Sequence, residues 1–76
     1  GLESLSKLYR LTKAELRVLA AICEVSSVSE AAEVVGASEA TVKTHLQRLF
    51  AKTGTNRQVD LVKLVASNAS PLRTGS

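Results

Sequence analysis

The stretch VSEAAEVVGASEATVKTHLQRLFAKTG, residues 28–54, decides the fold of this 76-residue chain. It contains two candidate helices, at about 28–35 and 39–53, that are separated by about three residues. Gly36 follows the first helix, where glycine commonly adopts the left-handed conformation that ends a helix. Ser38 precedes the second helix as a typical N-cap residue. Two helices joined this tightly, with glycine in the turn, predict a helix-turn-helix.

The spacing of residues around this turn supports the same prediction. Ala32 is small, so the second helix can approach the first one closely. Val42 follows Gly36 by six residues and can pack back beneath the first helix. A generic helical hairpin remains the alternative, because each of these features is common on its own.

The chain before this pair predicts a further helix at about 12–25. Thr12 and Glu15 form an S/T-x-x-E capping box, which begins a helix by pairing otherwise unpaired amides. Glu15 also projects into an apolar face, and a buried carboxylate needs partners. We expect the capping box to supply one partner and Arg57 to supply another. The apolar residues of this face are Leu11, Val18, Leu19 and Ile22.

Gly54 is placed to end the second helix of the pair, and a fourth helix follows it. The sequence therefore predicts an all-α fold, a four-helix bundle containing the helix-turn-helix, with helices at about 12–25, 28–35, 39–53 and 56–66. Residues 1–10 are expected to be an irregular extension or a linker from an upstream domain. Residues 11–68 form the predicted domain, and residues 69–76 a disordered tail. In the first helix of the pair we expect four residues to face inward: Ala31, Ala32, Val34 and Val35.

Length and composition narrow the classes of function. The chain is one small domain with little room for a buried active site. No apolar run approaches the roughly 20 residues of a transmembrane helix, and the start lacks a signal-peptide pattern. We therefore expect a cytoplasmic setting and no membrane contact. Catalytic residues, metal ligands and cofactor motifs do not emerge from the sequence, so we expect a protein that is not an enzyme and needs no cofactor.

The single cysteine, Cys23, excludes an internal disulfide and a cysteine-based zinc site. We expect it to be a small core residue rather than a reactive thiol, because it lies inside an aliphatic helix. His45 is the only histidine, and a metal site would need further ligands that the sequence does not place nearby.

Charge is distributed unevenly along the chain, whose net charge is +3. Residues 14–40 carry one base, Arg17, against five acids: Glu15, Glu24, Glu30, Glu33 and Glu39. Residues 41–63 carry one acid, Asp60, against five bases: Lys43, Arg48, Lys52, Arg57 and Lys63. This asymmetry indicates an anionic partner for the second half, although the acids of the first half can also pair with those bases.

The helix of about 39–53 has two different faces when its residues are placed at 100° intervals. One arc is apolar and wide enough to join a core: Val42, Leu46, Leu49 and Phe50. The opposite arc contains no acid: Ala40, Lys43, Thr44, Gln47, Arg48 and Ala51. A solvated polar face is the alternative, but such a face usually mixes charges of both signs. An acid-free face on the second helix of a helix-turn-helix favours recognition of DNA.

Side chains on this arc and beside it suit different parts of a DNA duplex. Lys43 can bond guanine, and Gln47 can pair bidentately with adenine. The small residues Ala40, Thr44 and Ala51 allow the backbone to approach the floor of a groove. Phosphates would run along one flank, which carries Thr41, His45 and Lys52 and lies near Arg48. For His45, a phosphate contact and a packed, hydrogen-bonded imidazole both remain open.

Three segments resemble the LuxR/NarL-type, or GerE-type, DNA-binding domain of bacterial transcription regulators: LTKAELRVL (11–19), SEATVKTHLQRLFAKTG (38–54) and NRQVDLV (56–62). The most specific part is Thr41-Val42-Lys43-x-His45, followed by Lys52-x-Gly54 and Arg57. The resemblance implies a four-helix bundle whose third helix enters the major groove. It implies base contacts by Lys43, Thr44 and Gln47. It implies DNA backbone contacts by Ser38, Thr41, His45, Arg48 and Lys52.

Some positions depart from the usual residues of that family: Ala31, Ala37, Thr53 and Asp60. The two alanines replace larger aliphatic residues, which implies looser packing around the turn. Thr44 and Gln47 make the reading face less basic than in some relatives, so the target sequence does not transfer from the resemblance.

Apolar residues of the fourth predicted helix cover an arc of about 220°, more than one core contact requires. The surplus can be a dimer seam, with Val59, Leu61, Leu64 and Val65 as the dimerisation residues, or can pack on an upstream domain. The resemblance implies a homodimer on double-stranded DNA and an N-terminal sensory or receiver domain. RNA polymerase is a further candidate partner.

Two other functions fit parts of the sequence. The promoter-reading module of a sigma factor has a similar SEATVKT turn, but His45, Lys52-x-Gly54 and the long fourth helix argue against it. A helical protein-interaction or dimerisation module would use the fourth helix as its working surface. That alternative predicts little salt-dependent binding to duplex DNA.

Overall fold

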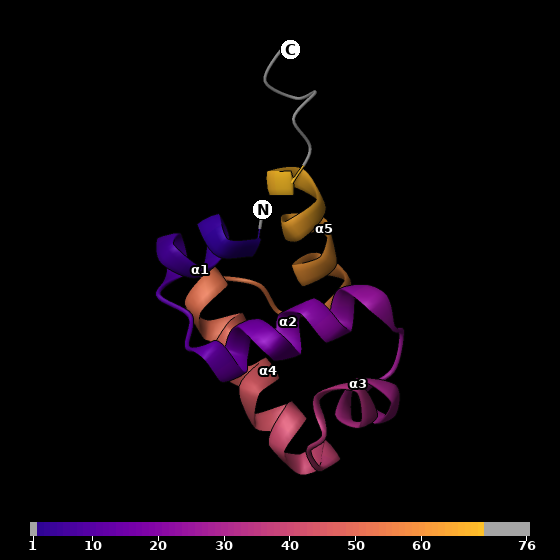
Figure 1. The fold of residues 1–76 in the computed structure, drawn as a ribbon. Helices are drawn as coiled ribbons and strands as arrows, with labels where there is room; N and C mark the ends of the chain where they lie inside the picture. Colours follow the sequence, from indigo (N-terminus) through magenta and orange to yellow (C-terminus); the bar gives the residue numbers. More distant parts are fainter. Residues whose placement is uncertain (1, 70–76) are drawn as a thin grey trace.

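The computed structural model describes residues 2–69 and contains only helices, turns and short connections within that range (Figure 1). The helices are α1 (Leu2–Tyr9), α2 (Lys13–Glu24), α3 (Val28–Val35), α4 (Glu39–Thr53) and α5 (Gln58–Ala69). The all-α fold class is thus confirmed, and α3 and α4 have the bounds expected for the helix-turn-helix. None of these five helices is both long and apolar enough to cross a bilayer. Of the tail predicted for 69–76, Ala69 is the last residue of α5, and residues 70–76 lie outside the described residues.

Local sequence explains where these helices begin and end. The capping box of α2 is confirmed: the Thr12 amide donates to Glu15 Oε1 at 3.0 Å, and the Glu15 amide donates to Thr12 Oγ1 at 3.1 Å. Ser38 caps α4 by accepting from the Thr41 amide at 3.1 Å. Gly36 ends α3 at φ 74°, in the left-handed region that glycine adopts without a steric penalty.

α1 is a helix that the sequence reasoning missed, because residues 1–10 were expected to be irregular. Its Leu5 is fully buried, and the helix packs against α5 and α2. Arg10 then takes the left-handed φ of 57° and the Leu11 amide donates to the Ser6 carbonyl at 2.9 Å, which closes α1. Eight residues make a helix that is marginal alone. Tertiary packing of its apolar face therefore stabilises α1.

A single core lies where α2, α3 and α4 pack on one another and α5 closes one side (Figure 1). In the view of Figure 1, α1 and α5 lie above α2, whereas α3 and the first half of α4 lie below it. Buried apolar side chains from all four helices form the core: Val18, Leu19, Ala21, Ile22, Ala31, Ala32, Val42, Leu46, Leu49 and Leu61. α2 touches each of the other helices and organises the bundle.

Three expectations about burial and helix bounds are wrong. Cys23 is exposed, because it lies one position further around α2 than the buried Ile22. Val34 is 54% exposed, because α3 turns Ala31 and Ala32 inward and Val34 lies beside that buried pair. α5 begins at Gln58 rather than at about 56 and extends to Ala69, beyond the expected end at about 66.

Candidate nucleic-acid interface

α4 is held by one face and leaves the opposite face open. Val42, Leu46 and Leu49 are buried against the other helices, and Phe50 is half-buried. All members of the acid-free arc are exposed: Ala40, Lys43, Thr44, Gln47, Arg48 and Ala51. The only acid of α4 is Glu39, in its first turn. The outward arc of α4 is therefore a neutral-to-cationic surface that is free of carboxylates after the first turn.

The three predicted base-contact residues differ in how free their polar atoms are. Lys43 and Gln47 are exposed and extend from the outward arc. The Thr44 hydroxyl donates to the Ala40 carbonyl at 3.1 Å, one helical turn earlier. This back-bond uses the donor of the hydroxyl, so Thr44 offers outward a methyl group and an acceptor oxygen.

Four of the five predicted backbone-contact residues lie together on the α2 side of that arc or at its start. Ser38 and Thr41 are exposed and linked, since the Ser38 hydroxyl donates to Thr41 Oγ1 at 3.0 Å. Arg48 is exposed, whereas His45 is half-buried. Within the described residues, His45 Nδ1 is buried without a hydrogen-bond partner. Unpaired buried polar atoms are rare and costly, so a water or another polar group is expected to pair with this nitrogen.

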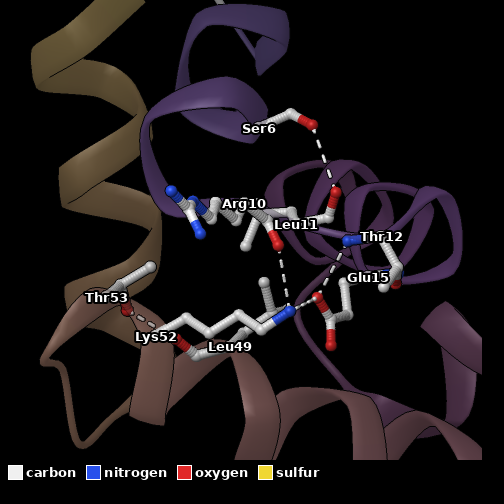
Figure 2. A network of polar contacts seen from close by, with 8 residues as sticks. All are labelled: Ser6, Arg10, Leu11, Thr12, Glu15, Leu49, Lys52 and Thr53. Atoms are coloured by element: carbon white, nitrogen blue, oxygen red, sulfur yellow. Dashed lines mark hydrogen bonds and ion pairs between the residues drawn. The ribbon is translucent and has the colours of Figure 1, made fainter.

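Lys52, the fifth predicted backbone contact, is turned into the fold instead (Figure 2). Its Nζ lies 2.6 Å from Glu15 Oε1 and donates to the Arg10 carbonyl at 3.0 Å. The Glu15 side chain is 1% exposed and that of Lys52 is 33% exposed. One ammonium group thus joins the last turn of α4 to the α1–α2 junction and to the first turn of α2.

Arg57 is not the partner of Glu15, contrary to the sequence-based expectation. Its Nε lies 3.4 Å from Asp60 Oδ2, and its side chain is largely in solvent. Because α5 begins just after Arg57, the guanidinium pairs with the acid of its own turn. Lys52 reaches Glu15 because the last turn of α4 crosses the start of α2.

Burial and hydrogen bonding act in opposite directions on the Glu15 carboxyl. Burial pushes its pKa up, but the Lys52 ammonium and the Thr12 amide outweigh this and hold the pKa below its ordinary value. Cys23 shows the opposite shift. Its side chain is exposed, but the part of it that lies against the fold loses some hydration, and this loss and the adjacent Glu24 carboxylate both raise the pKa of the thiol. A raised pKa leaves little thiolate at neutral pH and makes Cys23 a poor nucleophile.

The predicted dimerisation residues of α5 are not equally accessible. Leu61 is fully buried in the chain's own core, and Val65 packs against that core and is half-buried. Leu64 is half-buried and Val59 is 48% exposed. α1 packs on α5, so the same chain already covers part of the apolar surplus seen in the sequence. Within residues 2–69, no group of His, Cys, Asp or Glu side chains is arranged to hold a metal ion.

Fold and surface together define a helix-turn-helix domain whose second helix exposes an arc without carboxylates. Residues 9–65 match the family model described as bacterial regulatory proteins, luxR family. This match covers most of the chain, which therefore belongs to that family of DNA-binding regulators and not to a family of enzymes. Searches of curated proteins and of solved structures returned no match to the chain.

Sequence reasoning missed two features that support this surface: the helix α1 and the Lys52–Glu15 pair. The sequence does contain a signal for the pair, because Glu15 lies on an apolar helical face and a buried carboxylate needs a cationic partner. Lys52 and Arg57 were both available in the basic second half, and the choice between them depended on how α4 crosses α2.

Proposed function

We propose that the chain is the sequence-specific DNA-binding output domain of a bacterial transcription regulator, with α4 in the major groove. The observation that carries this proposal is the exposed, acid-free arc on the second helix of the helix-turn-helix. Lys43 and Gln47 supply hydrogen-bonding groups for base edges. Thr44 supplies a methyl group and an acceptor, which suit a thymine methyl or a base amino group.

The flank of the arc supplies contacts to the DNA backbone. Ser38 and Thr41 form a pair of hydroxyls at the N-terminus of α4, where amides and the helix dipole favour an anion. His45 and Arg48 follow along the same side. Lys52 acts one step removed: by binding Glu15 it holds the last turn of α4, so we assign it to positioning rather than to direct contact.

Pairing of two domains on a two-fold site would use the part of α5 that the chain leaves uncovered. Val59, Leu64 and Val65 contribute to that surface, while Leu61 supports it from inside. Only Val59 among these residues is exposed, so we expect the isolated domain to be monomeric in solution and to pair weakly on DNA. Sedimentation of the free domain as a tight dimer would contradict this. In the full-length protein, an N-terminal sensory or receiver domain would control pairing, and RNA polymerase would be recruited or obstructed in a cytoplasmic setting.

A second candidate function, a helical protein-interaction module, is favoured by one feature of α5. Val59 lies exposed beside an open hollow of about 510 Å³ between the end of α2 and the start of α5. Ile22, Val25 and Val62 also line this hollow. The hollow is away from the outward arc of α4, so the two functions predict responses in different parts of the chain.

Titration with random-sequence duplex DNA at two salt concentrations separates the two candidates, with amide chemical shifts as the readout. Salt-sensitive shifts clustered on residues 38–52 would support α4 as the DNA-binding element, because phosphate contacts weaken as salt rises. Absence of shifts there at low salt, with binding of a protein ligand at α5, would overturn the proposal in favour of the interaction module.

A further inference from the structure

Arg17 is the one base within the acid-rich segment 14–40, and neither the core nor the ion pairs account for it. It is exposed on α2 and lies on the side of α2 that faces the first turns of α4. Arg17 therefore lies next to the flank of α4, the helix proposed to read DNA, although it belongs to the acidic half of the chain.

A small pocket of about 70 Å³ lies between α2, the turn and α4 at this place. Arg17, Thr41 and His45 supply its polar lining, and Val18, Val35 and Ala37 its apolar lining. A volume of this size admits a water molecule or the oxygens of one phosphate group, but not a base. The pocket thus opens beside the flank that carries Ser38 and Thr41.

The Arg17 guanidinium is oriented by the fold and retains unused donors. Nη2 donates to the Val35 carbonyl at 2.9 Å, at the C-terminus of α3. A guanidinium has five N–H donors in a rigid planar fork, so one such bond fixes its orientation and leaves others for a ligand. A planar fork of this kind matches two oxygens of a phosphate.

His45 provides an independent indication that the pocket takes a hydrogen-bonding group. It lines the same pocket, and its Nδ1 is buried without a partner in the described part of the chain. A water or another polar group that enters the pocket and bonds to this ring nitrogen would recover the cost of its lost hydration. Such a group must be polar and small enough for the pocket.

We propose that Arg17 is a DNA-contacting residue: a phosphate of the duplex docks at the mouth of this pocket and is bound by the Arg17 guanidinium and the Thr41 hydroxyl. This inference rests on the proposed function. It adds α2 to the DNA-binding surface and places a contact where the sequence shows only an acidic segment. The Arg17–Val35 bond also means that the same side chain joins the end of α3 to the bound strand.

The test measures the dissociation constant for a random-sequence duplex across about 50 to 200 mM salt, for the wild type and for Arg17→Gln. Each phosphate contact contributes about 0.9 to the slope of log affinity against log salt. We expect Arg17→Gln to lower that slope by about one unit. The factor by which affinity falls across this salt range should then be roughly three times smaller for the variant than for the wild type. Arg17→Lys should keep the wild-type slope, because it keeps the charge.

Lys63→Gln is the matched control, since it removes one positive charge from an exposed position of α5. It should leave the salt slope unchanged. The thermal midpoint of each variant, measured alongside, shows whether the Val35 bond affects folding.

Three outcomes would contradict either the proposed function or the role of Arg17. If the wild type shows no salt-dependent binding, the proposed function itself fails. If the wild type binds and Arg17→Gln binds with the same slope, Arg17 only caps α3 and the inference is overturned while the proposed function stands. Equal slope losses for Arg17→Gln and Lys63→Gln would also overturn it, because the effect would then follow net charge alone.

Discussion

Lys43 and Lys52 are lysines of the same helix, yet the structure gives them opposite surroundings. Lys43 lies in the first half of α4, exposed on the acid-free arc. Lys52 lies in the last turn and binds the buried Glu15 carboxylate and the Arg10 carbonyl. A lysine at the surface of α4 is therefore available to a ligand only where no carboxylate of a neighbouring helix lies within reach. The difference separates the part of α4 that can bind DNA from the part that holds the helix in place.

Replacing Lys52 with Ala should produce the largest change in stability. It leaves a carboxylate buried with only its capping-box amide, and breaking a buried pair costs about 3–5 kcal/mol. We expect the free energy of unfolding to fall by about 3 kcal/mol, near the low end of that range, because Lys52 is partly exposed. Urea unfolding measures it, with Lys43→Ala as the control that should stay within about 0.5 kcal/mol of wild type. Equal stability of the two variants would show that the Lys52–Glu15 pair contributes nothing.

For DNA binding by folded protein we expect the opposite ranking, with substitutions on the outward arc of α4 having the larger effect. Lys43→Ala or Gln47→Ala should cost about 1–3 kcal/mol of binding free energy at a true site and relax base preference there. Arg48→Ala should instead weaken all sequences similarly, because a phosphate contact carries no base information. Competition between selected and random duplexes measures both effects. Equal loss on the two duplexes for Gln47→Ala would remove it from the set of base-reading residues.

Acid should weaken the fold through Glu15. Its pKa is lower in the folded chain than its ordinary value of 4.5, so the unfolded chain binds the proton more readily. The stability contributed by this group is therefore full above about pH 4.5 and is lost as pH falls through the lowered folded value. Unfolding of the wild type and of Glu15→Gln between neutral pH and pH 3 measures the difference. A constant gap between the two proteins across that range would contradict this account.

Arg57→Ala should have the smallest effect, within about 0.5 kcal/mol of wild-type stability. Its partner Asp60 is three residues away on the surface, and exposed pairs of this kind contribute little. The pH dependence of unfolding should also match wild type, in contrast to Lys52→Ala. A loss comparable to that of Lys52→Ala would mean that Arg57, and not Lys52, compensates Glu15.

Much of the fold follows from patterns a few residues long. Thr12 with Glu15, and Ser38, are confirmed as caps because they bond to amides only three residues away. Gly36 and Gly54 both adopt positive φ at the ends of their helices. The two arcs of α4 are confirmed as buried and exposed, since a regular helix fixes the angle between its own residues.

Errors arose where an interaction partner is distant in sequence. α1 is only eight residues long, too short to be stable alone, and its apolar face packs on α5 and α2, which are distant in sequence or follow it. Leu61 carries the same apolar signal as Val59, but only Leu61 meets the core. Cys23 and Val34 lie in apolar helices just outside the arcs that their neighbours cover. Periodicity identifies an apolar face, whereas the width of the covered part depends on the packing of other helices.

The sequence by itself determined the helix-turn-helix, its caps, and which arc of α4 is free of acids, because these depend on local hydrogen bonds and helical geometry. Only the tertiary structure decided that Lys52 belongs to Glu15, that Arg17 lies across a pocket from Thr41 and His45, and that α1 covers part of α5. Those relations join residues far apart in the chain. They are set by the angles at which α2 crosses α4 and α5, which follow from how whole side chains fill the core.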